Sequence, residues 1–403
     1  FFPQHLAELP PTSASILVPW LERLLRSASG AIHDPRSMVR AAGKEIHVVH
    51  DICYHPFGPS VASSAQYLDV YMPPEADRTS SLPVVVFLHG GGWRRGTRRS
   101  KIFHFFQNVG LALADLGFVA VLPSYRKSLP YAPWLLGMMI STATMGMTAL
   151  VISILGARAF HVSVETSRRP IAFIFAAWSG LSLAFRQLIR WVCPGVRHPA
   201  HLEDCAMAVE WVCAGGTRAF GGDPKKVILL GNSAGAHLAS MLVLESSKPS
   251  PTKSPKSPSS KSALRGLIAI SGVYSGPRFY KNWFTRHMFG YVFDDHSNWD
   301  ACFPLGCCPD PSEGEGRAQP LRDLCPVLLI NAQIDVGLQA HADDFAQRLR
   351  QCGAQVSGPV IIPGTDHFRM LPMLGRHQRG KTRSREDREL LPLIADFVKR
   401  VCE

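Results

Sequence analysis

A serine framed by glycines carries the clearest chemical signal in this sequence. The segment Gly231-Asn232-Ser233-Ala234-Gly235 follows an apolar run at 226–230 and precedes a helical pattern. A sharp turn between a strand and a helix projects a serine oxygen above the sheet, and the flanking glycines avoid clashes with neighbouring strands. We therefore predict that Ser233 is a nucleophile and that the backbone N–H of Ala234 points into the same space.

A glycine-rich turn is the second signal. His89-Gly90-Gly91-Gly92-Trp93 comes directly after an apolar run at 82–88. Successive glycines let the backbone turn its N–H groups outward and approach a ligand closely. With the N–H of Ala234, those of Gly90 and Gly91 would form an oxyanion hole, in which one donor contributes about 2.7–4 kcal/mol to the transition state. The alternative is a phosphate-binding turn, but no GxGxxG pattern or Walker lysine follows.

The elements that must position these residues follow from alternating apolar runs and helical patterns. We predict strands at 45–54, 66–72, 82–88, 118–122, 226–230, 265–270, 326–330 and 355–362, and helices at 102–116, 201–213, 234–244, 338–352 and 386–401. This rhythm predicts an α/β protein with a mostly parallel central sheet of about eight strands and helices on both faces. The first two strands have no helix between them, so we expect an antiparallel start.

The two motifs together resemble the α/β-hydrolase superfamily. More narrowly, they are similar to hormone-sensitive-lipase-like and feruloyl or acetyl esterase-like carboxylesterases, and in motif style to kynurenine formamidases and isoprenylcysteine methylesterases. The phrases Leu68-Asp69-Val70-Tyr71, Tyr125-Arg126 and Glu203-Asp204 fit the same group. The resemblance covers about 66–126 and 198–401, and it implies an α/β-hydrolase fold and a serine esterase.

The resemblance also implies the chain order nucleophile, acid, histidine. Asp335 follows the strand predicted at 326–330, and His367 follows the strand predicted at 355–362. Both therefore reach the carboxyl edge of the sheet, where Ser233 also emerges. In the implied roles, His367 takes the Ser233 proton and returns it to the leaving group, while Asp335 fixes the His367 tautomer and stabilises the imidazolium.

Two other histidines and a tryptophan lie close to these motifs. We interpret His89 as a structural residue that hydrogen-bonds the glycine turn. His237, one helical turn after Ser233, is interpreted as a packing or supporting residue. Trp93 is a candidate wall of the acyl or alcohol pocket.

The remaining acids and a late histidine are weaker candidates. Asp366 is adjacent to His367, but its side chain should point away from the histidine. Asp343 and Asp344 fall inside a helical pattern, and we interpret them as part of its solvent-exposed face. His377 lies in a basic run at 376–388 and is predicted to be exposed.

Composition excludes several classes of protein. In the 403 residues, 46% are hydrophobic and 18% charged, which rules out wholesale disorder. The formal net charge of 43 − 31 = +12 indicates affinity for anionic surfaces. The basic runs lack interleaved aromatic residues, so we predict no nucleic-acid partner. The 10 cysteines form no paired CxxC pattern, so we expect reduced thiols and no metal site.

An apolar insertion at 128–196 interrupts the alternation. Ser128 to Ala157 and Pro170 to Phe185 contain no charged residue, and the first run exceeds the roughly 20 residues that cross a bilayer. The favoured interpretation is a membrane hairpin or shallow anchor through 128–190, with the core facing the cytosol. The alternatives are an apolar cap over the site in a cytoplasmic protein, or a segment foreign to the working protein.

A basic segment follows the glycine turn and would support such an anchor. It contains Arg94, Arg95, Arg98, Arg99 and Lys101. These side chains would meet anionic lipid head groups, or they form a solvated basic loop. Other predicted parts are an N-terminal helical extension at 1–40, a core at 41–127 and 197–403, and a disordered Pro/Ser/Lys loop at 246–262.

The function predicted from these observations is hydrolysis of a small carboxylic ester, lipophilic esters included, through an acyl-enzyme. No metal or organic cofactor is required. Amide hydrolysis of the kynurenine formamidase type and demethylation of a prenylated cysteine ester are alternatives within enzymes. A different class is an inactive, membrane-bound binding protein, against which the intact Ser233, Asp335 and His367 argue.

Overall fold

The computed structural model describes residues 38–41, 44–77, 79–99, 106–128, 195–247, 263–281, 292–293, 299–309, 321–372, 374–375 and 384–403. By its contacts the chain divides into two units, one of Phe1–Arg126 with His198–Glu403 and one of Lys127–Arg197. The predicted insertion belongs to the second unit. Nearly all of it, like most of the predicted extension at 1–40 and most of the loop at 246–262, lies outside the described residues.

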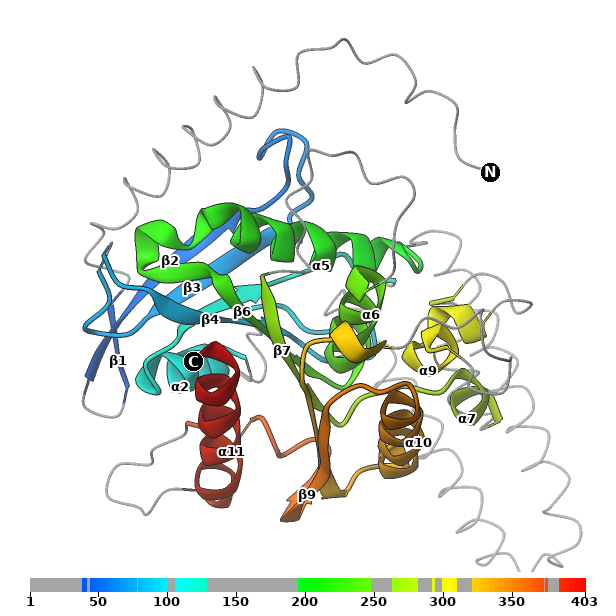
Figure 1. Ribbon diagram of the computed structural model, residues 1–403. Helices are drawn as coiled ribbons and strands as arrows, with labels where there is room; N and C mark the ends of the chain where they lie inside the picture. The colour runs from blue at the N-terminus through cyan, green and yellow to red at the C-terminus, as the bar shows by residue number, and fades with distance from the viewer. Residues whose placement is uncertain are drawn as a thin grey trace, which may run out of the picture. The chain divides into compact units, whose positions relative to one another are not determined.

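A nine-stranded mixed sheet forms the centre of the first unit, in the order β1-β2-β3-β5-β4-β6-β7-β8-β9 (Figure 1). The strands are β1 (Met38–Ala41), β2 (Lys44–Cys53), β3 (Tyr67–Met72), β4 (Leu82–Leu88), β5 (Val119–Pro123), β6 (Gly222–Asn232), β7 (Leu264–Ile270), β8 (Val327–Ile334) and β9 (Val356–Asp366). Pairing is antiparallel from β1 to β5 and parallel from β5 to β9. The predicted mostly parallel sheet with an antiparallel start is confirmed.

Strand β1 corrects one predicted boundary. Most of it falls inside the segment predicted as a helical extension, but its residues pair with β2 in register Met38↔His47 to Ala41↔Lys44. The pairing satisfies backbone groups that an exposed edge of β2 would otherwise present. Four residues between turn signals carry too little periodicity to distinguish a short edge strand from a helix.

The helices that the structure describes in the first unit cover both faces of the sheet (Figure 1). Their bounds are α2 (Gln107–Asp115), α5 (Ala200–Trp211), α6 (Ala234–Ser247), α7 (Gly276–Lys281), α9 (Pro304–Cys307), α10 (Leu338–Gln351) and α11 (Arg385–Cys402). The first two residues of the loop predicted at 246–262 therefore form the end of α6. Within the described part of the chain, no helix has both the length and the apolar character needed to cross a bilayer.

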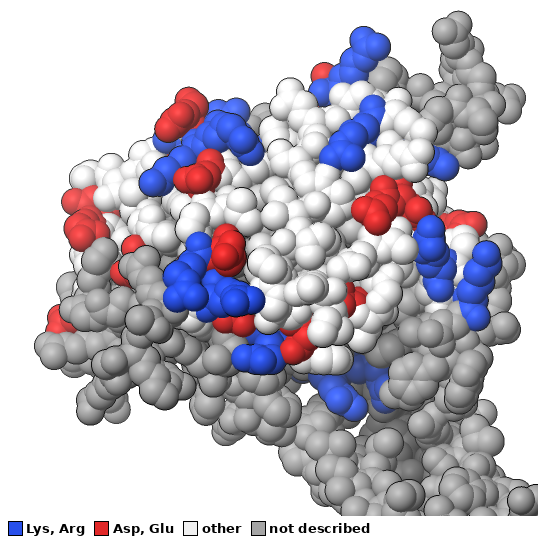
Figure 2. Space-filling view, turned by 90° about the horizontal axis from the view of Figure 1, so that it is seen from below, with Lys and Arg blue, Asp and Glu red and all other residues white. Residues whose placement is uncertain are grey.

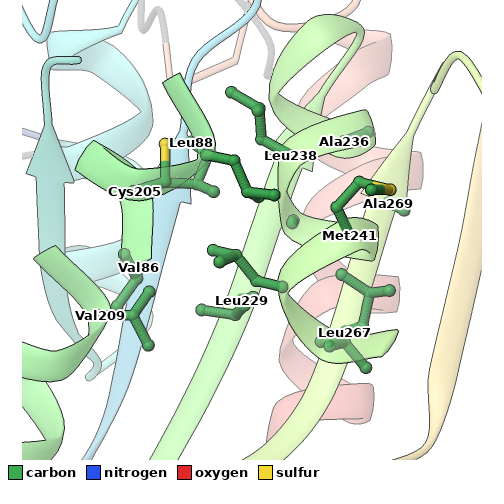
Figure 3. Close-up of a cluster of buried hydrophobic side chains, with 14 of the residues drawn as sticks. Val86, Leu88, Cys205, Val209, Leu229, Ala236, Leu238, Met241, Leu267 and Ala269 are labelled. Atoms are coloured by element: carbon green, nitrogen blue, oxygen red, sulfur yellow. The ribbon is translucent and has the colours of Figure 1, made fainter. Parts of the chain in front are cut away.

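Burial on two faces explains the unbroken apolar run of β4. Val84, Val86 and Leu88 belong to one buried cluster, with side chains of α5, α6 and α10. Val85 and Phe87 belong to a second cluster, with side chains of α2 and α11. Successive strand residues point to opposite faces, so both sets must be apolar. Figure 3 shows the first cluster, in which α5 and α6 pack over β4, β6 and β7. This packing fixes the start of α6, where Ser233 lies.

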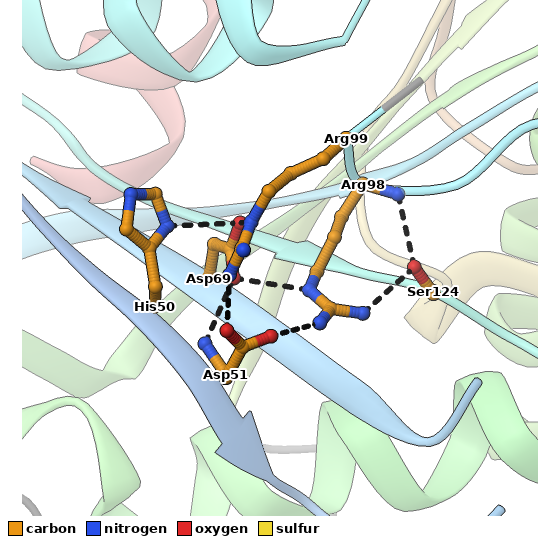
Figure 4. A network of polar contacts seen from close by, with 6 residues as sticks. All are labelled: His50, Asp51, Asp69, Arg98, Arg99 and Ser124. Carbon is orange, nitrogen blue, oxygen red and sulfur yellow. Dashed lines mark hydrogen bonds and ion pairs between the residues drawn. The ribbon is translucent and has the colours of Figure 1, made fainter. Parts of the chain in front are cut away.

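The buried carboxylate of Asp69 holds the chain that follows the glycine turn (Figure 4). Its Oδ1 accepts hydrogen bonds from Arg98 Nε at 3.0 Å and Arg99 Nη2 at 2.8 Å, and its Oδ2 accepts one from Arg99 Nε at 2.6 Å. Asp51 on β2 forms ion pairs with both arginines. The backbone N–H of Arg98 donates to Ser124 Oγ at 2.9 Å. Asp69 on β3, Asp51 on β2 and Ser124 after β5 thereby hold the loop that contains Arg98 and Arg99.

This network corrects the interpretation of the basic segment at Arg98 and Arg99, whereas Arg95 is exposed. The side chains of Arg98 and Arg99 are only 12% and 32% exposed and are held by carboxylates, so they form neither a solvated loop nor a lipid-facing surface. On the face shown in Figure 2, several Lys and Arg side chains likewise lie beside Asp or Glu. Lys101 is outside the described residues. Sequence alone gave no sign that an aspartate some thirty residues earlier pairs with these arginines.

A second buried carboxylate, that of Asp204 on α5, fixes the chain after β5. It accepts hydrogen bonds from Gln66 Nε2, from the backbone N–H of Arg126 and from Arg126 Nη2, each at 2.8 Å. Two of the three phrases that resemble the esterases thus meet at this carboxylate. They join the start of β3 and the chain after β5 to α5.

We predict that Asp69→Asn lowers the free energy of unfolding by about 3–5 kcal/mol. The substitution removes the buried negative charge that pairs with Arg98 and Arg99. Burial by itself would raise the pKa of Asp69, but hydrogen bonds from Arg99 and His50 and the charges of both arginines hold that pKa well below its usual range. The stabilisation is therefore complete above about pH 4 and falls as the pH drops towards the folded-state pKa.

Urea unfolding of both proteins at several pH values checks this prediction. The matched control is Asp51→Asn in the same network. The Asp51 side chain is 56% exposed, so its loss should cost about 1 kcal/mol or less. Equal destabilisation by the two variants would contradict a special role for the buried carboxylate.

Candidate active site

Ser233 occupies a strained turn between β6 and α6. Its φ is 54°, in a region that residues other than glycine adopt at a cost of about 1–3 kcal/mol. Its backbone N–H donates to the Ile270 carbonyl at 2.8 Å, and its own carbonyl accepts from the His237 N–H at 3.1 Å. The strand on one side and the helix on the other hold this conformation in place.

The glycines on either side of Ser233 are required by close backbone approaches. A Cβ at Gly231 would collide with the backbone of Gly235 and Ala236, and a Cβ at Gly235 would collide with the carbonyl of Leu88. The turn therefore folds tightly on itself and lies directly against the end of β4. This is the physical reason for the pattern that singled out Ser233 in the sequence.

The glycine-rich turn after β4 lies beside the serine. A Cβ at Gly90 would stand 3.2 Å from the Ser233 Cβ and 2.8 Å from the side-chain oxygen of Asn232. Gly91, Gly92 and Trp93 have φ values of 117°, 60° and 58°, so the turn runs through left-handed conformations. Of the backbone expected to supply the oxyanion hole, Gly90 lies against Ser233 and Ala234 follows it in the chain, while the part of Gly91 stays a prediction.

His89 and Trp93 at the two ends of this turn are buried. His89 Nδ1 donates to the Gly90 carbonyl at 2.8 Å, and its ring stacks on Tyr125 at 4.3 Å between centroids. Trp93 is 1% exposed and meets His237 edge to face at 5.0 Å. Both side chains support the turn from the interior. The part proposed for Trp93 in a substrate pocket stays a prediction.

Asp335 and His367 lie in direct contact. Asp335 follows β8 and His367 follows β9. Because Ile334 pairs with Asp366, Asp335 and His367 lie at the same level along the two strands. His367 Nδ1 lies 2.7 Å from Asp335 Oδ1, and the side chains are 12% and 0% exposed. A carboxylate at Nδ1 fixes the tautomer in which Nδ1 carries the proton and Nε2 is free to accept one.

The second oxygen of Asp335 is held by three donors. Its Oδ2 accepts from Ser271 Oγ at 2.7 Å, from Asn331 Nδ2 at 2.7 Å and from the backbone N–H of Ala332 at 3.1 Å. Sequence reasoning assigned no role to Ser271 or Asn331. For Ser271 the available signal was its position, since it follows β7 as Ser233 follows β6.

The competing acids have other tasks. Asp366 Oδ1 accepts the backbone N–H groups of Phe368 at 2.9 Å and Arg369 at 3.0 Å, so its side chain caps the turn after His367. Asp344 pairs with Arg278, and Asp343 is exposed. His377 falls outside the described residues.

His237 is a neutral, interior residue. Its Nε2 donates to the Cys302 carbonyl at 2.7 Å. Burial, reinforced by the neighbouring His198, lowers its pKa to about 3. A histidine that stays neutral and already donates through Nε2 supports the helix start and does not compete with His367 as a base.

The candidate residues therefore gather at one edge of the sheet, after β4, β6, β7, β8 and β9. Among the residues described, no hydrogen bond joins Ser233 to His367, and such contacts are often loose in free enzymes and tighten with substrate. Also within those residues, no group of three or more His, Cys, Asp or Glu could hold a metal ion.

The sheet order and the strand–turn–helix that carries Ser233 are those of the α/β-hydrolase fold. A family model described as "alpha/beta hydrolase fold" matches residues 192–368. A second model, named BD-FAE, matches residues 68–134. Together these matches enclose the glycine turn, the serine turn, the acid and the histidine.

Among individual proteins, the chain is 27% identical over 185 residues to isoprenylcysteine alpha-carbonyl methylesterase of Arabidopsis thaliana, covering 43% of this chain and 41% of that one. It is 23% identical over 228 residues to the probable carboxylic ester hydrolase LipM of Mycobacterium tuberculosis, covering 57% and 35%. The chain therefore spans well under half of the length of the curated relatives it matches. Esterase B from Lactobacillus rhamnosis shares the fold, with a TM-score of 0.56, 14% identity and coverage of 96% and 94%.

Proposed function

We propose that the protein is a serine hydrolase that cleaves a carboxylic ester through an acyl-enzyme, with Ser233, His367 and Asp335 as its catalytic residues. The observation that carries the proposal is the 2.7 Å contact between His367 Nδ1 and the fully buried Asp335 side chain. A buried, hydrogen-bonded acid that orients a partly exposed histidine at the edge bearing a strained serine is the arrangement that activates a hydroxyl nucleophile.

The reaction follows from these positions. His367 Nε2 takes the Ser233 proton as the serine oxygen attacks the ester carbonyl, and Asp335 stabilises the imidazolium that forms. The backbone N–H groups of Gly90, Gly91 and Ala234 stabilise the tetrahedral oxyanion. His367 then protonates the leaving alcohol, and water repeats the sequence to release the acid.

Apolar side chains beside the acid and the histidine favour a lipophilic substrate. Ile334 is 70% exposed, Val336 66% and Phe368 72%, and each adjoins Asp335 or His367 in the chain. Large exposed apolar groups at one place mark a surface that binds apolar partners. We therefore propose that an alkyl or acyl chain of the ester lies along them, and expect kcat/KM to rise with acyl length in an ester panel.

Covalent labelling of the whole chain with a fluorophosphonate probe tests the catalytic assignment. The wild type should be labelled, and Ser233→Ala should not. The control is Ser81→Ala, which removes an exposed hydroxyl that donates to Asp223 and should label normally. An unlabelled wild type would favour the rival hypothesis of an inactive binding protein. Labelling of Ser233→Ala would place the nucleophile elsewhere.

A second candidate function is hydrolysis of a prenylated cysteine methyl ester. The similarity to isoprenylcysteine alpha-carbonyl methylesterase favours it, and the apolar residues beside the site suit a prenyl chain. Amide hydrolysis of the formamidase type uses the same catalytic residues. A panel of a farnesylcysteine methyl ester, simple acyl esters and an aryl formamide separates the three, because the highest kcat/KM identifies the preferred bond.

Membrane association through 128–190 stays a prediction. It rests on the uncharged runs of that segment, nearly all of which lies outside the described residues. Recovery of the whole chain in the supernatant of detergent-free extracts would contradict it.

A further inference from the structure

The two oxygens of the Asp335 carboxylate have different tasks. Oδ1 faces His367, while Oδ2 accepts from Ser271, Asn331 and the Ala332 N–H. A carboxylate is symmetric, so nothing in the group itself selects which oxygen meets the histidine. The three donors on Oδ2 make that choice, and they also hold the plane of the carboxylate.

Ser271 makes its contribution at the cost of an unfavourable backbone. It is 1% exposed, follows β7 and has a φ of 50°. Its N–H donates to the Ile330 carbonyl at 2.8 Å, which places it between the ends of β6 and β8. Glycine would adopt this conformation without strain, yet the chain has a side chain there, and its hydroxyl reaches Asp335. Strain of this kind persists only where the surrounding structure holds the conformation in place, and it is concentrated at functional sites.

We propose that Ser271 is a positioning residue for the hydrolysis, acting on His367 through Asp335. This inference rests on the proposed function. The Ser271 hydroxyl holds Asp335 Oδ2, so that Oδ1 stays aligned with His367 Nδ1 while positive charge develops on the imidazole. Asn331 Nδ2 acts on the same oxygen from β8, so the loss of Ser271 weakens the alignment without abolishing it.

Steady-state hydrolysis of p-nitrophenyl acetate by Ser271→Ala, Ser271→Gly and the wild type provides the test. Both variants should lower kcat about tenfold, as expected for one hydrogen bond to a charged group, with KM changed less than about twofold. Fluorophosphonate labelling of Ser233 should slow by a similar factor. Ser271→Gly should melt at a higher temperature than Ser271→Ala, because glycine relieves the positive φ.

A double-mutant comparison separates positioning from a general structural role. In an Asp335→Asn background, Ser271→Ala should change kcat less than about twofold, because the carboxylate it serves is gone. The control is Ser240→Ala, a buried serine on α6 whose hydroxyl has no hydrogen-bond partner among the described residues. It should keep wild-type kcat.

The outcomes are distinguishable. Wild-type kcat in both Ser271 variants, or the same tenfold loss in the Asp335→Asn background, would overturn the positioning role while labelling of Ser233 still upholds the hydrolase. Absence of turnover and labelling in the wild type would overturn the proposed function and this inference together.

Discussion

Ser233→Ala should lower kcat for an activated ester by about 10⁴- to 10⁶-fold, because alanine removes the nucleophile of the proposed acyl-enzyme. His367→Ala should cause a loss of the same order, since an unactivated hydroxyl is a poor nucleophile near neutral pH. What remains should reflect the oxyanion donors and substrate binding alone. Burst and steady-state kinetics with p-nitrophenyl acetate measure both variants.

The double variant Ser233→Ala/His367→Ala gives the sharper result. Residues that act as one unit lose nearly everything when either is removed, so the double variant should be no slower than Ser233→Ala. Additive losses would mean that the two side chains act independently. His341→Ala is a matched control, because His341 is a buried histidine whose Nδ1 accepts the N–H groups of Tyr274 and Ser275. Its loss should affect stability more than kcat.

The serine turn was predictable because its pattern is a direct consequence of sterics. Gly231 and Gly235 are fixed by backbone approaches within a few residues of Ser233 and to the end of β4, so a local motif carries the whole constraint. The apolar run 82–88 was equally informative, because burial on both faces leaves no room for polar residues. The contact between Asp335 and His367 could be expected from the chain order that the resemblance implies, because parallel strands end at one edge of the sheet.

The carboxylate networks were not predictable in the same way. Asp69 meets Arg98 and Arg99 because β3 pairs with β5 and the loop after the glycine turn lies against both strands. Such pairing depends on topology, and a charge run in sequence gives no sign of a buried partner. Ser271 was missed for a related reason: a single hydroxyl after a strand has no motif, and its target becomes visible only when β7 and β8 are neighbours.

Asp335→Asn should lower kcat by about 10⁴-fold, the order found when a catalytic aspartate of this kind becomes an amide. The reason lies in the three donors around Oδ2. Ser271, Asn331 and Ala332 all donate there, so the amide oxygen of the substituted side chain would face them and its NH₂ group would face His367. His367 Nδ1 would then have to accept a hydrogen bond, which places the proton on Nε2.

A histidine protonated at Nε2 cannot take the Ser233 proton, so the variant should bind ester with nearly unchanged KM and fail in the chemical step. The matched control is Asp366→Asn. Its carboxylate caps the turn after His367, and asparagine caps such turns as well, so kcat should stay within about threefold of the wild type. Stopped-flow acylation rates for both variants decide the matter. If Asp366→Asn proved the slower of the two, the acid would be misassigned, and the buried contact at Asp335 would serve the fold alone.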